Sequence, residues 1–215
     1  MTNSAEPPIA KINANVDSAA SPQDSDANQE PITMRRRSLL PRDLALIALF
    51  AALIAVLGLP GAFTLFGAAV PITAQTQGVM LAGSILGAKR GFLAVTAFLA
   101  LVAAGVPLLP GGRGGIGSFA APSGGYLIGW ALGALVIGIL VTKMTGRAKL
   151  PWLITANVVG GIFAIYLIGI PFTAWRVGSG MVATITSAVQ YLPGDLIKAV
   201  LSAAITIGVH RSYPI

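Results

Sequence analysis

The sequence predicts an all-α membrane protein with six transmembrane helices, and three features of its composition carry this prediction. Hydrophobic residues make up 55% of the 215 positions and charged residues only 10%, against about 25% charged in ordinary soluble domains. The charges leave long gaps, since none lies between Asp43 and Lys89 or between Arg113 and Lys143. Crossing the hydrocarbon core of a bilayer takes about 20 predominantly apolar residues, which these gaps supply. The basic residues gather beside the gaps, where they act as topology signals.

Residues 1–34 form a separate segment, whose composition predicts a disordered cytoplasmic tail. The stretch from Ser18 to Asp26 consists of Ser, Ala, Pro, Gln and Asp, which bury too little apolar surface to offset the entropy lost on ordering. No apolar stretch follows a short basic start, so the segment is not expected to be a signal peptide. Residues 35–215 are expected to form one domain of six transmembrane helices.

Six apolar segments within residues 35–215 are expected to be these helices. Pro71 precedes the second helix, and the turn from Gly87 to Gly91 separates it from the third, so both are short. Residues 171–190 are weakly apolar and are compatible with an extra short helix. The expected helices cover residues 44–59, 76–88, 92–106, 126–141, 152–170 and 193–209.

The distribution of basic residues predicts the orientation in the membrane. With six spans, the two termini and the loops after the second and fourth helices share one side, which carries 10 basic residues near the membrane. The opposite side carries only Arg113 and Arg176. Because basic loops stay in the cytoplasm, both termini are expected there. The 10 residues are Arg35, Arg36, Arg37, Arg42, Lys89, Arg90, Lys143, Arg147, Lys149 and Arg211.

Several residue types are too scarce for an enzyme or a metal protein. The chain has no cysteine, and its single histidine, His210, has no carboxylate near it in the sequence, so no metal site is expected. Asp195 is the only acidic residue after Asp43, which leaves too few groups for an acid–base or nucleophilic constellation. The net charge of +7 is spread over helix ends and forms no basic patch with interleaved aromatics, so no nucleic-acid partner is expected.

A glycine-rich stretch matches a nucleotide-binding motif but lacks the acidic residue that normally follows it. Residues 112–117 read G-x-G-x-x-G, but that fingerprint needs an acidic residue about 20 positions later, and the next one is Asp195. The phosphate-binding pattern G-x-x-x-x-G-K-[ST] is also absent from the sequence. The glycines instead predict irregular backbone, which a membrane protein tolerates only where protein or a water-filled cavity covers it.

One charged pair inside an apolar segment is the strongest candidate for a functional site. Asp195 and Lys198 stand three positions apart, so both project from one face of the expected sixth helix. A charged side chain at bilayer depth costs about 2.5–3.5 kcal/mol on insertion scales and normally faces an interior cavity on a substrate path. The alternative is structural, with Asp195 capping the helix and Lys198 merely pairing with it.

Three segments together resemble the BioY family, the biotin-specific S components of energy-coupling factor (ECF) importers. Family members often have Thr where this chain has Ser123, a mild departure. The likeness covers roughly residue 42 to the end. The three segments are residues 70–76 with 81–83 and 86–87, residues 111–115 with 121–129, and residues 192–195 with Lys198.

The resemblance implies an S-component fold with a biotin pocket near the outer face, in a bacterial cell membrane. Biotin would be the transported ligand, and no cofactor is implied. The partners would be a transmembrane T component and two ATPase subunits, which this chain does not encode. An S component for another small vitamin and a structural membrane subunit remain the alternative functions.

The chemistry of biotin assigns roles to the charged candidates. Ionised Asp195 can only accept hydrogen bonds and suits the ureido N–H groups, whereas Lys198 can only donate and suits the ureido carbonyl. Arg113, in the glycine-rich loop, is expected to bind the ligand's carboxylate as a bidentate partner. An exchange of roles, with Lys198 on the carboxylate, is the alternative assignment.

Further side chains are weaker candidates. Gln75, Tyr126 and Asn157 are expected to add neutral hydrogen bonds, and Trp130 an apolar wall. Ala48 and Ala52 stand four apart on the first helix, and the resemblance implies that such an alanine motif docks the T component. Packing within the chain itself is the alternative for these alanines.

Overall fold

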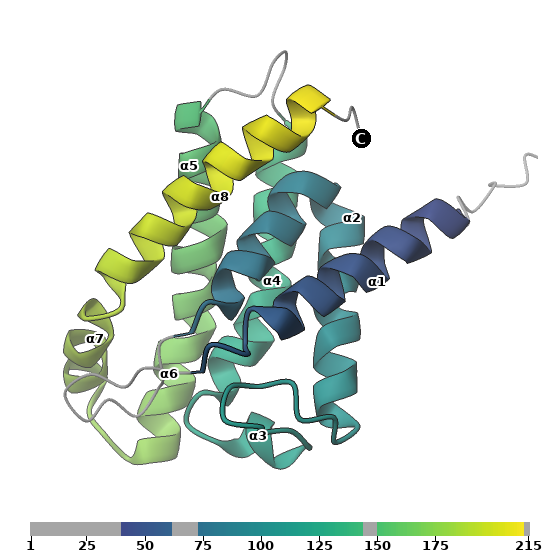
Figure 1. Ribbon diagram of the computed structural model, residues 1–215. Coiled ribbons are helices and arrows are strands. Elements are labelled where there is room, and N and C mark those ends of the chain that lie inside the picture. The colour runs from purple at the N-terminus through teal and green to yellow at the C-terminus, as the bar shows by residue number, and fades with distance from the viewer. Residues whose placement is uncertain (1–39, 62–72, 144–149, 213–215) are drawn as a thin grey trace, which may run out of the picture. The chain divides into compact units, whose positions relative to one another are not determined.

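The computed structural model describes residues 40–61, 73–143 and 150–212, and most of these residues lie in helices (Figure 1). The predicted all-α class is confirmed. The tail expected at residues 1–34 lies outside the described residues. The helices are α1 (Pro41–Val56), α2 (Gln75–Ala103), α3 (Gly117–Ala120), α4 (Gly124–Thr142), α5 (Leu150–Val158), the π-helical η1 (Val159–Ala164), α6 (Ile165–Val177), α7 (Met181–Val189) and α8 (Leu192–Ser212).

The predicted second and third helices are the two halves of α2, which folds back on itself (Figure 1). The bend lies at Gly87, whose φ of 77° and ψ of −176° fall outside the helical region. A Cβ added at Gly91 would lie 2.7 Å from the carbonyl oxygen of Ala82, whereas a straight helix would separate these two residues by about 13.5 Å. The two halves therefore pack against each other.

The predicted fifth helix is longer than expected. It runs continuously through α5, η1 and α6 from Leu150 to Val177, with Pro171 inside it. Gly178, in a left-handed conformation with φ of 70°, ends α6. The extra short helix that residues 171–190 allowed is α7. A π-helical turn often marks a functional position in a helix, and Gly161 of η1 lines the cavity described below.

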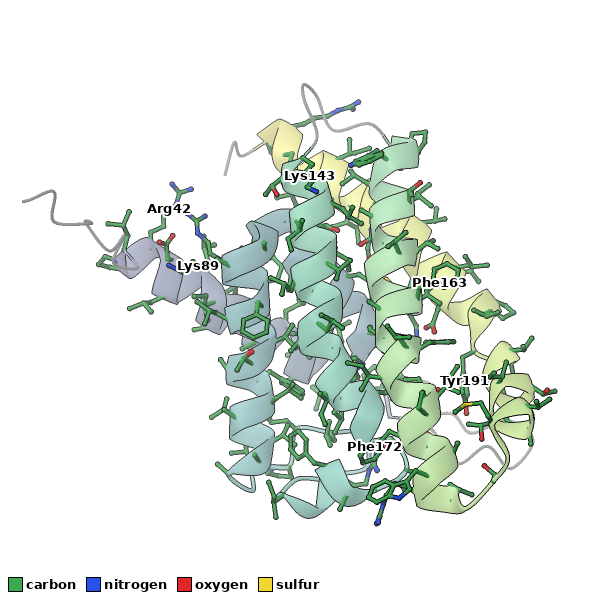
Figure 2. The ribbon with its side chains drawn as sticks, turned by 180° about the vertical axis from the view of Figure 1, so that it is seen from behind. Arg42, Lys89, Lys143, Phe163, Phe172 and Tyr191 are labelled. Atoms are coloured by element: carbon green, nitrogen blue, oxygen red, sulfur yellow. The ribbon has the colours of Figure 1, made fainter. Side chains whose placement is uncertain are left out.

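Among the residues that the structure describes, four helical stretches are long and apolar enough to cross a membrane: Gln75–Ala103, Gly124–Thr142, Leu150–Val177 and Leu192–Ser212. The first of them contains the bend at Gly87. Large apolar side chains on their outer surface are exposed, as Figure 2 shows for Phe163. Phe163 is 66% exposed and Leu167 is 72% exposed, a pattern that lipid accommodates and water does not.

Close packing around α4 forms the core. Glycine allows α2 to approach α4, since a Cβ added at Gly83 would lie 2.7 Å from the carbonyl oxygen of Ala134. Gly129 likewise allows α4 to approach α6, since a Cβ added at Gly129 would lie 2.9 Å from the carbonyl oxygen of Ile165. Small residues are the usual means of close helix contact in membranes. This packing brings α2, α4 and α6 together, and α8 packs on α2 and α5.

Candidate functional site

A cavity of about 60 Å³ lies among α2, α4, η1, α6, α8 and the loop that precedes α3. It has room for a few water molecules, each of which needs about 10–15 Å³. Six of the seven side chains predicted as ligand contacts line it, although they come from distant parts of the sequence. They are Gln75, Arg113, Tyr126, Trp130, Asp195 and Lys198.

Asp195 and Lys198, which the spacing places on one helical face, form an ion pair in the first part of α8. Lys198 Nζ lies 3.0 Å from Asp195 Oδ1, and the two side chains are 13% and 9% exposed. Lys198 Nζ also donates to the carbonyl oxygen of Thr73 at 2.7 Å and to Thr76 Oγ1 at 3.0 Å. An ammonium group has three N–H donors, so each donor of Lys198 has a protein partner.

The second carboxylate oxygen of Asp195 also has a partner. Tyr166 Oη donates to Asp195 Oδ2 at 2.7 Å. The Tyr166 ring meets the Tyr126 ring edge to face, with the ring centroids 5.7 Å apart. A carboxylate accepts about four hydrogen bonds, so Asp195 keeps free acceptor capacity after binding Lys198 and Tyr166. The pair therefore presents acceptors, and not donors, to the cavity.

Gln75 and Trp130 bring neutral polar groups to the cavity. Gln75 Nε2 donates to the carbonyl oxygens of Ile54 at 3.2 Å and Leu108 at 3.0 Å, which joins α2 to α1 and to the loop before α3. Gln75 Oε1 and Trp130 Nε1 are buried and have no hydrogen-bond partner. The Trp130 ring lies against Phe98, with a centroid separation of 6.2 Å.

A tight glycine turn presents Arg113. The backbones of Leu109 and Arg113 pair through reciprocal hydrogen bonds of 3.0 and 3.2 Å. Gly111 and Gly112 between them adopt φ values of 79° and 70°, which glycine reaches without steric cost. Arg113 Nε donates to the carbonyl oxygen of Pro110 at 3.3 Å. The side chain is exposed yet lines the cavity, so a charged donor stands at its border.

Asn157 is the one predicted contact that the structure does not bring to the cavity. Its Oδ1 accepts a hydrogen bond from Ser84 Oγ at 2.8 Å, and its Nδ2 donates to the carbonyl oxygen of Ala199 at 3.3 Å. The side chain is fully buried and joins α5 to α2 and α8. Both ends of the amide thus serve protein partners.

Sequence reasoning did not single out Thr73, Thr76 or Tyr166. The two threonines provide partners for Lys198, and Tyr166 provides one for Asp195. A signal was available, because a buried charge must find polar partners and these hydroxyl-bearing residues lie beside or within apolar helices. Which of the many Thr, Ser and Tyr residues supply them depends on how the helices pack.

The two alanines proposed for docking lie on the outer face of α1. Ala48 and Ala52 are exposed, whereas Ala51 is buried. Asp43, in the first turn of α1, pairs with Arg90 Nε on α2 at 2.9 Å. Packing within the chain therefore uses the Asp43 and Ala51 side of α1 and leaves the Ala48 and Ala52 side available.

Comparisons with known proteins agree with one another. The model of the BioY family matches residues 28–215. A biotin transporter BioY of Rhizobium etli is 44% identical over 179 residues, which are 81% of this chain and 96% of that protein. A probable biotin transporter BioY of Bacillus subtilis is 46% identical over 170 residues, with coverages of 79% and 91%.

A solved structure has the same fold. The crystal structure of the S-component for biotin from an ECF-type ABC transporter matches with a TM-score of 0.75 and 33% sequence identity. The match covers 79% of this chain and 91% of that chain. With both the sequence and the fold in agreement, the chain belongs to the BioY family.

Proposed function

We propose that this chain is the biotin-binding S component of an ECF-type importer. The observation that carries the proposal is the cavity itself, where the Asp195–Lys198 pair of α8 and Arg113 of the loop before α3 come together. Biotin combines a ureido group, an apolar thiophane ring and a carboxylate. The cavity offers acceptors on Asp195, aromatic surface on Tyr126 and Trp130, and a guanidinium on Arg113.

The contacts refine the role of each charged residue. Asp195 accepts a ureido N–H with its remaining acceptor capacity, and Arg113 binds the carboxylate with the guanidinium nitrogens not bound to Pro110. Lys198 orients the carboxylate of Asp195 and balances its charge. For Lys198 to donate to the ligand, as the sequence first suggested, it would have to release Thr73, Thr76 or Asp195.

Direct biotin titration of the purified full chain tests this function. We expect saturable binding of biotin and no competition from other water-soluble vitamins added in excess. Competition by another vitamin at equal or lower concentration would instead support an S component of different specificity. Folded protein that binds none of them would favour a structural subunit.

An importer of this type also needs an energising module, which we propose to be a T component with two ATPase subunits. The exposed Ala48 and Ala52 support a docking surface on α1, because small residues allow another helix to come close. Ala48→Trp should abolish biotin uptake in cells while the purified variant binds biotin like the parent. Ala100→Trp, at an exposed position of α2 and away from this face of α1, is a control for the effect of bulk alone. Normal uptake by Ala48→Trp would contradict the docking surface.

We further propose six membrane crossings in the bacterial cell membrane, with both termini in the cytoplasm. The two packed halves of α2 support two crossings, and α1 supplies another. Figure 2 supports a common basic side, since Arg42, Lys89 and Lys143 lie toward one end and Phe172 toward the other. The chain has no cysteine, so single cysteines placed at Ser38 and Gly112 should react from opposite sides. Reaction from the same side would overturn this topology.

A further inference from the structure

Two unpaired polar atoms in the cavity wall are of complementary kind. Trp130 Nε1 is a hydrogen-bond donor and Gln75 Oε1 is an acceptor, and both residues line the cavity. Trp130 is 5% exposed and Gln75 is 0% exposed. Native proteins leave few buried polar atoms unpaired, so each case calls for an explanation. Within the described ranges, the other such side-chain atoms belong to Gln190 and Ser202, and neither residue lines this cavity.

The orientation of the Gln75 amide is determined by its surroundings. Its Nε2 donates to two backbone carbonyl oxygens, those of Ile54 and Leu108. Carbonyl oxygens only accept, so turning the amide over would set Oε1 against two acceptors and lose both hydrogen bonds. Oε1 is therefore the atom left without a partner, next to a cavity in which Asp195 also has free acceptor capacity.

The donor side is equally constrained. Each N–H group of Lys198 already has a protein partner. Using one of them on a ligand would break a hydrogen bond that holds the Asp195–Lys198 pair. Trp130 Nε1 has no partner to release, so a carbonyl group that binds to it gains a hydrogen bond without breaking one within the protein.

We propose that Trp130 and Gln75 determine specificity for the ureido ring, an inference that rests on the proposed biotin function. Trp130 Nε1 donates to the ureido carbonyl, Gln75 Oε1 accepts one ureido N–H, and Asp195 accepts the other. A cyclic urea offers one acceptor between two donors, which this set of one donor and two acceptors complements. Trp130 thus contributes a hydrogen bond in addition to an apolar surface.

Replacing Trp130 by Phe tests the donor, because it removes the N–H and keeps an aromatic ring. The matched control is Trp152→Phe, since Trp152 Nε1 donates to the carbonyl oxygen of Leu140 and the residue does not line the cavity. Three ligands are titrated: biotin, desthiobiotin, which keeps the ureido ring, and 2-iminobiotin, whose protonated imino group replaces the carbonyl acceptor. Trp130→Phe should weaken biotin and desthiobiotin by about tenfold or more and leave 2-iminobiotin little changed.

Two results would overturn the assignment. One is parent-like biotin affinity in Trp130→Phe, and the other is an equal loss for all three ligands, which would mean that Trp130 acts only through packing. If Trp130→Phe does not fold, the unaltered protein still tests whether the ureido carbonyl accepts a hydrogen bond. In that case it should bind biotin at least about tenfold more tightly than 2-iminobiotin. Equal affinity for the two would refute the role of the carbonyl. A parent protein that binds no biotin would refute the proposed function itself.

Discussion

Two carboxylates occur among the described residues, and each is paired with a cation, but the two pairs lie in different surroundings. Asp43 pairs with Arg90 between α1 and α2, with 11% and 35% of the side chains exposed. Asp195 pairs with Lys198 beside the cavity, with 9% and 13% exposed. Asp43 uses its second oxygen on the backbone N–H of Leu40 at 3.1 Å, whereas Asp195 uses its second oxygen on Tyr166.

This difference shows how similar ion pairs serve different purposes. The Asp43 pair joins the start of α1 to α2 just past the bend at Gly87. Its carboxylate also accepts a hydrogen bond at the start of α1, where a negative charge is favourable. The Asp195 pair links two positions of a single helix and is held by residues from α2, α6 and the segment before α2. We therefore expect the Asp43 pair to affect stability and the Asp195 pair to affect ligand binding.

The largest contrast is expected from the same substitution at the two acids. Asp195→Asn and Lys198→Ala should each weaken biotin binding by at least about a hundredfold, because removing one partner of a buried pair typically costs about 3–5 kcal/mol. Asp43→Asn is the matched control and should bind biotin like the parent. Titration of correctly inserted protein measures all three. Parent-like binding by Asp195→Asn and Lys198→Ala would make this pair structural as well.

A smaller effect on binding is expected from Tyr166→Phe. This change removes the hydrogen bond to Asp195 Oδ2 and leaves the aromatic ring in place. Hydrogen bonds to charged groups contribute about 1.5–3 kcal/mol, so biotin affinity should fall by roughly tenfold. In the double variant with Asp195→Asn, the added loss should shrink, since the two residues act together. Fully additive losses would show that Tyr166 contributes independently of Asp195.

The smallest effect is expected at the Asp43–Arg90 pair, and on stability alone. Arg90 is partly exposed, so breaking the pair with Asp43→Asn should cost about 1 kcal/mol. For a chain of this size that corresponds to a melting temperature about 2–4 °C lower. Thermal unfolding in detergent, with and without biotin, measures the change. A loss of biotin affinity as large as that of Asp195→Asn would remove the distinction between the two pairs.

Several features of this protein follow from its sequence by itself. Long gaps without charge predict the apolar helices, because hydrocarbon admits few charges. The spacing of Asp195 and Lys198 predicts their pairing, because side chains three apart on a helix are neighbours. The glycines around Arg113 predict irregular backbone, and the structure has a tight turn there. All of these depend on interactions between residues close in the sequence.

Only the tertiary structure decided which distant side chains meet. Asn157 and Gln75 are both polar residues of apolar segments, yet Gln75 lines the cavity and Asn157 joins three helices away from it. The two threonine partners of Lys198 lie more than a hundred positions earlier in the chain. Packing among α2, α4, α5, α6 and α8 sets the rotation of each helix and so determines these contacts. Local sequence patterns do not contain that information, because a small rotation of a helix turns a cavity residue into a core residue.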